Sequence, residues 1–199
     1  MDMPAIVSTP DVSVAIYSGT GSSLRAKFPA TFVANPRFKT EVSAFGIVAD
    51  ADNKTPANVA AEYAAAFQPH FPNFPIIPGN VDQSAIRTGI FVLPDNAAEG
   101  TLENILLECA DDVYPNLKAG AETFLNGIDR AALDAHDREE IEAPAGLNKA
   151  RVGCVVNVLK PGKTSQASIQ DNRWLDGETL NLPRVVAVSN FLRQLIALP

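Results

Sequence analysis

The sequence predicts an α/β protein in which a parallel sheet is flanked by helices and is followed by a mostly helical C-terminal half. Residues 43–49 form a nearly continuous apolar run, which is typical of a strand that a parallel sheet covers on both faces. Residues 86–93 indicate a second apolar strand. The 199 residues suit a single domain, with a core over about residues 12–110 and a helical part over about 111–199.

The N-terminal part begins with a strand and a glycine-rich loop. Residues 12–17 alternate and are rich in β-branched side chains, which predicts a strand. The loop at residues 19–23 follows, and its Gly19 and Gly21 are candidates for binding a phosphate through the backbone. A plain turn explains the loop better, because the lysine of a P-loop and the third glycine of a dinucleotide fingerprint are absent. Residues 24–34 predict a short helix.

Two apolar strands and the helices after them form the centre of the predicted fold. The run at 43–49 ends in Asp50, and residues 56–67 predict a helix that Thr55 caps. Four prolines at 68–82 indicate an irregular crossing loop. The strand at 86–93 ends at Pro94, and a helix follows from Thr101 to Cys109. The predicted buried face of that helix consists of Leu102, Ile105, Leu106 and Cys109.

The rest of the chain is predicted to be helical, with one break. The predicted helices span about residues 115–127, 130–142, 147–158 and 183–197. The acidic side chains of the second of these suit a solvated face better than a metal site. Pro161–Ser165 resembles the tail of a phosphate loop but follows a helix, so it is predicted to be a surface turn.

Composition limits the classes of partner and the compartment. A net charge of −7 argues against a general electrostatic grip on DNA or RNA, although a divalent cation can supply the missing positive charge. Cys109 and Cys154 are far apart and predict buried thiols in a reducing compartment. Neither a signal peptide nor an apolar run of roughly 18 residues occurs. We therefore expect a cytoplasmic protein that does not interact with the membrane.

Asp50 and Asp52 follow the first apolar strand directly. In an extended segment, residues i and i+2 point to the same side, so two carboxylates would lie together at the carboxyl end of the strand. Oxygen ligands of this kind suit Mg²⁺ or Mn²⁺. The alternative is a pair of solvated acids in a turn. His70 and His136 have no cluster of ligand residues around them.

Asp95 and Glu103 follow the second apolar strand in the same way. If the two strands are neighbours, Asp95 and Glu103 converge with Asp50 and Asp52 on one acidic corner. Glu103 also lies in the first turn of a predicted helix, where the helix dipole favours a carboxylate. A purely structural role for Glu103 is therefore the alternative.

Three segments carry a resemblance to a known family. FGIVADAD, GIFVLPDNAAEGTLENILLE and LNKARVGCVVNVLKPG resemble an uncharacterised family of small prokaryotic proteins with a Toprim-like fold, related to the Toprim domains of OLD-type nucleases. The resemblance implies Mg²⁺-dependent phosphodiester chemistry. It matches Asp50 and Asp52 to the metal-binding acid pair and Asp95 and Glu103 to the later acids. Lys149 matches a lysine that would neutralise phosphate charge.

One departure from the Toprim pattern lies at the N-terminus. Toprim proteins carry a glutamate, usually as Val-Glu-Gly, at the end of an earlier strand, and no Val-Glu-Gly occurs in this sequence. The early acids Asp2 and Asp11 stand in other contexts. Either the chain is truncated or the catalytic site has degenerated, and a sheet without that strand would expose an edge for a partner.

Three functions follow from these patterns. In the first, Asp50, Asp52 and Asp95 bind a metal, Glu103 acts as an outer ligand or base, and Lys149 holds a phosphate of a nucleic acid or nucleotide. In the second, the chain is a catalytically degenerate binding or assembly protein, with a protein partner or a second copy. In the third, a nucleotide- or nucleoside-binding enzyme uses Gly19 and Gly21. The apolar stripe that motivates the second consists of Val185, Val188, Phe191, Leu192, Leu195 and Ile196.

Overall fold

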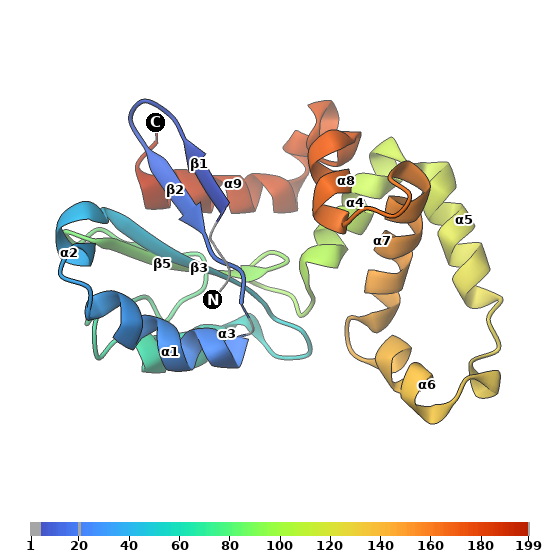
Figure 1. The fold of residues 1–199 in the computed structure, drawn as a ribbon, viewed down its shortest axis with the longest axis horizontal. Helices are drawn as coiled ribbons and strands as arrows, with labels where there is room; N and C mark the ends of the chain where they lie inside the picture. Colours follow the sequence, from blue (N-terminus) through green and yellow to red (C-terminus); the bar gives the residue numbers. More distant parts are fainter. Residues whose placement is uncertain (1–4, 20, 199) are drawn as a thin grey trace. The chain divides into compact units, whose positions relative to one another are not determined.

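The computed structural model describes residues 5–19 and 21–198 (Figure 1). The chain divides into two compact units. The first contains the described residues up to Ala49, then Ala57–Phe91, then the described residues from Phe191 onward. The second contains Asp50–Pro56 and Val92–Asn190. This division does not follow the expected boundary near residue 110, because segments from several parts of the sequence build each unit.

The first strands form a hairpin of their own. Strand β1 (Ala5–Ser8) pairs with β2 (Ser13–Ile16) in an antiparallel sheet in which Ala5 lies opposite Ile16. The strand predicted at 12–17 is therefore present. Within the described residues it pairs with β1 and belongs to no parallel sheet.

The main sheet has the order β3-β5-β4 and consists of β3 (Ala44–Asp50), β4 (Val81–Asp82) and β5 (Arg87–Leu93). The Arg87 N–H donates to the Ser43 carbonyl at 3.0 Å, and the Ala51 N–H donates to the Leu93 carbonyl at 3.2 Å. Since the two starts and the two ends pair, β3 and β5 run in the same direction. Strand β4 is antiparallel to β5. The α/β class is confirmed, and the parallel pairing of the described strands is limited to β3 and β5.

Aromatic rings pack α1 (Gly21–Val33) and α3 (Pro56–Phe67) onto one face of β3 (Figure 1). The ring centroid of Phe45 lies 5.0 Å from that of Phe28 and 5.2 Å from that of Phe67. The helix predicted at 56–67 is confirmed at the same bounds. The shorter helix at 24–34 begins three residues earlier than predicted, and a further short helix, α2 (Phe38–Glu41), follows it.

The end of helix α9 (Pro183–Ile196) packs on the opposite face of the sheet. A Cβ at Gly46 would collide with the Leu195 side chain, and a Cβ at Gly89 would lie 2.9 Å from the Phe191 ring. Glycine at these positions allows α9 to approach the strands closely. Phe191 and Leu195 of the predicted apolar stripe are buried, which is core packing. Val48 is 47% exposed, so the prediction that β3 is covered on both faces is wrong at that residue.

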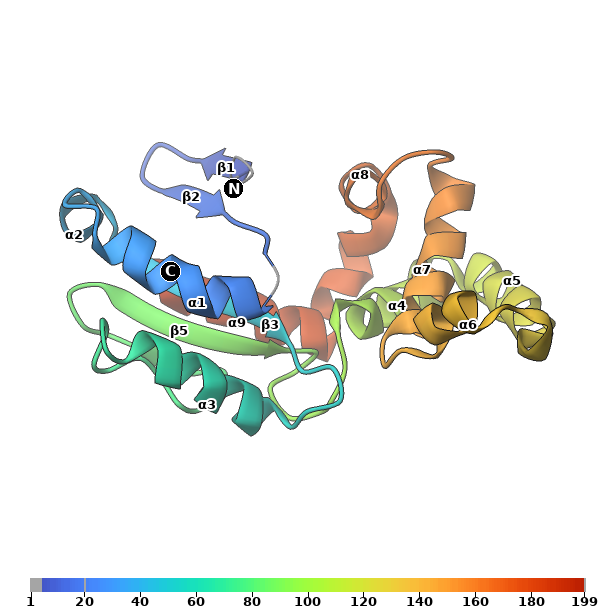
Figure 2. The same cartoon turned by 60° about the horizontal axis from the view of Figure 1, so that its bottom comes forward.

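The second unit is helical. Its helices are α4 (Leu102–Val113), α5 (Pro115–Asn126), α6 (Ala135–Glu142), α7 (Gly146–Leu159), α8 (Ser165–Asp171) and the start of α9, with 3-10 turns at Arg130–Ala132, Arg173–Leu175 and Gly177–Asn181. Figure 2 shows α4, α5 and α7 side by side. The helical C-terminal half is therefore confirmed, whereas α8 lies where no helix was expected.

The core of this second unit is aliphatic and surrounds Trp174. Its buried members are Leu106, Leu107, Ala110, Ala121, Val152, Val155, Val156 and Trp174. The indole N–H of Trp174 donates to the Ser168 hydroxyl at 3.0 Å, which satisfies a fully buried donor. Leu102 is 44% exposed and does not belong to the buried face of α4 as predicted, because it occupies the first position of the helix.

Both cysteines lie in helices and are free thiols. Burial, and then the charges of Glu108 and Asp112, raise the pKa of Cys109 to about 11, so this thiol stays protonated and unreactive at neutral pH. Among the described residues, no helix combines the length and the apolar character that a membrane crossing requires.

Candidate functional site

Asp50 joins the end of β3 to the start of α4. Its Oδ1 accepts a hydrogen bond of 2.9 Å from the backbone N–H of Leu102, the first residue of α4. The first N–H groups of a helix have no partner within the helix, and a carboxylate also complements the positive end of the helix dipole. A residue 52 positions earlier in the sequence therefore satisfies an N–H group at the N-terminus of α4 and lies near Glu103.

Asp52 lies in a turn and not in an extended strand. Its φ is 53°, which is the left-handed region, and its N–H donates to the Gly100 carbonyl at 2.8 Å. Residues 50–52 are therefore not extended, and the predicted alignment of the Asp50 and Asp52 side chains assumed a backbone conformation that the structure does not have. The two charges still interact, since Asp52 is one of the groups that raise the pKa of Asp50.

Several groups shift the pKa of Asp50 in opposite directions, and the net shift is upward. Burial raises the pKa of its carboxyl above the ordinary value, and the Leu102 N–H opposes this by stabilising the ionised form. The negative charges of Glu103 and Asp52 raise it further, whereas the ammonium group of Lys149 lowers it. The structure therefore places Glu103, Asp52 and Lys149 within electrostatic reach of Asp50.

Glu103 and Lys149 also line a pocket of about 620 Å³ among α4, α7 and α8. The pocket is bounded by Leu102, Glu103, Leu106, Lys149, Val152, Ser165, Gln166, Ile169 and Gln170. The α8 residues were not singled out from the sequence. The signal that α8 exists was a helix cap, because the Thr164 hydroxyl accepts from the Ala167 N–H at 3.3 Å.

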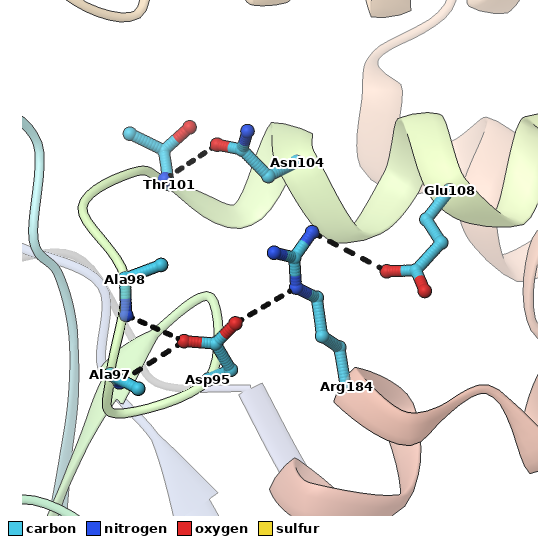
Figure 3. A network of polar contacts seen from close by, with 7 residues as sticks. All are labelled: Asp95, Ala97, Ala98, Thr101, Asn104, Glu108 and Arg184. Carbon is cyan, nitrogen blue, oxygen red and sulfur yellow. Dashed lines mark hydrogen bonds and ion pairs between the residues drawn. The ribbon is translucent and has the colours of Figure 1, made fainter.

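The Asp95 carboxylate contacts Arg184 of α9 (Figure 3). The carboxylate accepts hydrogen bonds from the N–H groups of Ala97 at 3.0 Å and Ala98 at 2.8 Å, and lies 3.0 Å from Nε of Arg184. A further ion pair of 3.5 Å joins Arg184 to Glu108. Sequence reasoning missed Arg184, since 89 residues separate it from Asp95 and no local pattern connects them.

These contacts determine the ionisation of Asp95. Burial opposes the charged form, but the N–H groups of Ala98 and Ala97 and the guanidinium of Arg184 outweigh it and hold the pKa below its ordinary value. Asp95 contacts Arg184 and the N–H groups of Ala97 and Ala98, whereas Asp50 contacts the start of α4. The convergence of all four acids stays a prediction.

The comparison with family models gives one match, which covers residues 1–197. The chain belongs to the family described as "Protein of unknown function (DUF3226)". Searches of curated proteins and of solved structures found no match. The Toprim-like resemblance stays a prediction.

The donor chemistry of the Asp50 corner of this DUF3226 chain suits a hard cation. Magnesium is commonly held by one or two carboxylates, with water and substrate phosphate completing its coordination. No group of three or more His, Cys, Asp or Glu side chains that could hold a metal ion occurs in the part of the chain that the structure describes.

The other predicted features of this DUF3226 chain lie elsewhere. Gly21 is the first residue of α1, so the loop predicted at 19–23 is shorter than expected, and Thr20 lies outside the described residues. His70 and His136 are exposed. The turn predicted at Pro161–Ser165 is confirmed up to Thr164, and α8 begins at Ser165.

Proposed function

We propose that the chain carries out Toprim-type phosphodiester chemistry that depends on Mg²⁺ or Mn²⁺ and acts on a nucleic acid or a nucleotide. The hydrogen bond from the Leu102 N–H to Asp50 Oδ1 carries this proposal, because it places the acidic end of β3 beside Glu103. The parallel direction of β3 and β5 further supports a Toprim-like sheet. Ligands of open α/β sheets bind at the carboxyl ends of such strands.

Each side chain has a separate role. Asp50 and Asp52 are the proposed cation ligands, and a bound cation would offset the negative charge that develops on the transferring phosphoryl group. Glu103 is an outer ligand or a base, and Lys149 pairs with a phosphate oxygen. Asp95 serves as a third ligand only if its ion pair with Arg184 opens.

Calorimetry with Mg²⁺ and Mn²⁺, combined with cleavage of a single-stranded oligonucleotide, tests the proposal. Wild type is expected to bind the cation and to cleave, and Asp50→Asn is expected to lose both. Asp137→Asn, an exposed acid on α6, is the matched control and should behave as wild type. Absence of cation binding by wild type at about millimolar concentration would rule the proposal out.

A catalytically degenerate binding protein is the second candidate. The observation that favours it is the Arg184 network, which commits one predicted acid, Asp95, to a structural contact. This candidate predicts that the wild type binds Mg²⁺ without cleaving any phosphodiester. Sedimentation would then reveal a second copy or a co-purifying partner.

A nucleotide-binding enzyme that uses Gly19 and Gly21 is the third candidate. It is favoured by the start of α1 at Gly21, because backbone N–H groups at a helix N-terminus attract anions. Gly21→Ala should then weaken binding of a free nucleotide, whereas Asp50→Asn should not. Calorimetric titration of both variants with the same nucleotide separates this candidate from the first.

A further inference from the structure

The pocket of about 620 Å³ among α4, α7 and α8 has a size that suits a small organic ligand, since such sites measure about 300–1,000 Å³. Its floor includes Leu106 and Val152, which belong to the buried core of the second unit. The half-buried Ile169 packs against the same core. A well-packed apolar floor of this kind is a fixed surface against which a flat ring can lie.

Charged side chains line one part of the pocket, and neutral polar side chains of α8 line another. Glu103 and Lys149 line it and also act on the charge of Asp50, so its charged part borders the Asp50 corner. On α8, the pocket is lined by Ser165 and by the primary amides of Gln166 and Gln170. Residues four apart lie on one helix face, so the two amides are neighbours. Each amide offers both donors and an acceptor.

We propose that this pocket holds the base and sugar of a mononucleotide whose phosphate lies at Lys149. The inference rests on the proposed function, in which Lys149 and the Asp50 corner hold the phosphate. Leu106, Val152 and Ile169 contact the faces of the base, and the amides of Gln166 and Gln170 bond to its polar edge. The pocket thus selects a nucleotide over inorganic phosphate.

The charge of the chain favours a single nucleotide as the ligand. Lys149 is the only cationic residue in the lining of this pocket. Binding along a polyanionic backbone normally needs several lysine or arginine contacts, and the chain as a whole carries a net charge of −7. One cationic side chain in the lining therefore favours a single nucleotide over a length of duplex DNA or RNA as the occupant of the pocket.

Calorimetric titrations of the full chain with adenosine and cytidine 5′-monophosphate and with inorganic phosphate, each with Mg²⁺ and with EDTA, test the inference. At least one nucleotide should bind about ten-fold or more tightly than phosphate, because burial of its apolar ring surface adds to the phosphate contacts. Equal affinity of both nucleotides and phosphate would overturn the inference.

Two variants locate the binding. Ser165→Trp fills the pocket from an exposed position and should remove the preference for the nucleotide while leaving phosphate binding unchanged. Gln166→Ala should weaken nucleotide binding only. Ser189→Trp and Gln194→Ala, which change exposed residues of α9, are the matched controls and should bind as wild type. A Ser165→Trp variant that still prefers the nucleotide would overturn the inference.

The outcomes separate this inference from the proposed function. Phosphate binding that needs Mg²⁺, without preference for a nucleotide, keeps the cation site and rejects the pocket. A preference for the nucleotide over phosphate that persists in EDTA and is removed by Ser165→Trp supports the pocket, and absence of cation binding by the same wild type in calorimetry rejects the cation site. If wild type binds neither phosphate nor nucleotide, both are rejected.

Discussion

The cores of the two units are built from different side chains. In the first unit, phenylalanine rings pack on each other, as Phe67 does on Phe45 at 5.2 Å and on Phe74 at 5.1 Å between centroids. In the second unit, aliphatic side chains surround Trp174, and directional contacts are added to them. Trp174 donates to Ser168, and Arg184 joins Asp95 to Glu108.

The difference separates two ways of stabilising a fold. Burial of apolar rings contributes in proportion to the buried area, and this hydrophobic contribution has no direction, whereas ring pairs only prefer stacked or edge-to-face arrangements. Hydrogen bonds and ion pairs require defined geometry, and they fix the side chains that make them. The acids and the lysine of the candidate site all belong to the second unit, where such contacts orient Asp50 and Asp95.

The largest effect is expected from breaking the ring cluster of the first unit. Phe67 is fully buried, so Phe67→Ala should lower the free energy of unfolding by about 3–5 kcal/mol. Urea denaturation followed by far-UV circular dichroism measures the change. Val48→Ala, at a residue that is 47% exposed in the same unit, should cost less than about 1 kcal/mol. Equal losses in the two variants would contradict the assignment of the ring core.

A smaller effect is expected at the buried polar contact of the second unit. Ser168→Ala leaves the indole N–H of Trp174 without its acceptor, which should cost about 1–3 kcal/mol. Trp174 is the only tryptophan, so its fluorescence reports the change directly during denaturation. Ser189→Ala, at an exposed position, is the control. Unchanged fluorescence and stability of Ser168→Ala would show that this bond contributes nothing.

The ion pairs of Arg184 should contribute about 1 kcal/mol to the free energy of unfolding, and this contribution should depend on pH. The pKa of Asp95 is lower in the folded chain than in the unfolded chain, so ionised Asp95 contributes to the free energy of unfolding. This contribution is fully present above the ordinary Asp pKa of about 3.9 and is lost as the pH falls through the lowered pKa. Arg184→Gln should lower the free energy of unfolding at neutral pH and make its further decrease at acid pH smaller. Denaturation at a series of pH values measures both. Arg173→Gln, which breaks a more exposed pair, should leave the acid loss as in wild type.

The smallest effect is expected at Asp50. The raised pKa of Asp50 means that folding disfavours its ionised form, which lowers the free energy of unfolding. This loss of stability is present when the pH lies above the raised pKa and is absent when the pH lies below the ordinary pKa of an aspartate. An asparagine keeps the acceptor for the Leu102 N–H without the charge. Asp50→Asn should therefore stabilise the chain at neutral pH by about 0.5 kcal/mol or less. Thermal denaturation at neutral and acid pH checks the sign. A loss of stability would mean that the negative charge itself is needed at the start of α4.

Several elements could be predicted because their signals are local. The helix at Pro56–Phe67 has a proline at its start and regular apolar spacing, and the strand at Arg87–Leu93 is an apolar run closed by Pro94. Helix α8 was missed because its seven residues carry little periodicity. Strand β1 was missed because it has only four residues and all of them are exposed.

The sequence by itself determined the α/β class, the helical C-terminal half and the acids at the two strand ends. Hydrophobic periodicity and the proline, glycine and capping residues that end helices and strands are properties of neighbouring residues. Only the tertiary structure decided which of these acids meet. Asp50 is directed to the start of α4 by a hydrogen bond across 52 positions, whereas Asp95 is directed to Arg184 across 89. The partner of a charged side chain depends on contacts between distant segments, and the spacing of residues along the chain does not encode it.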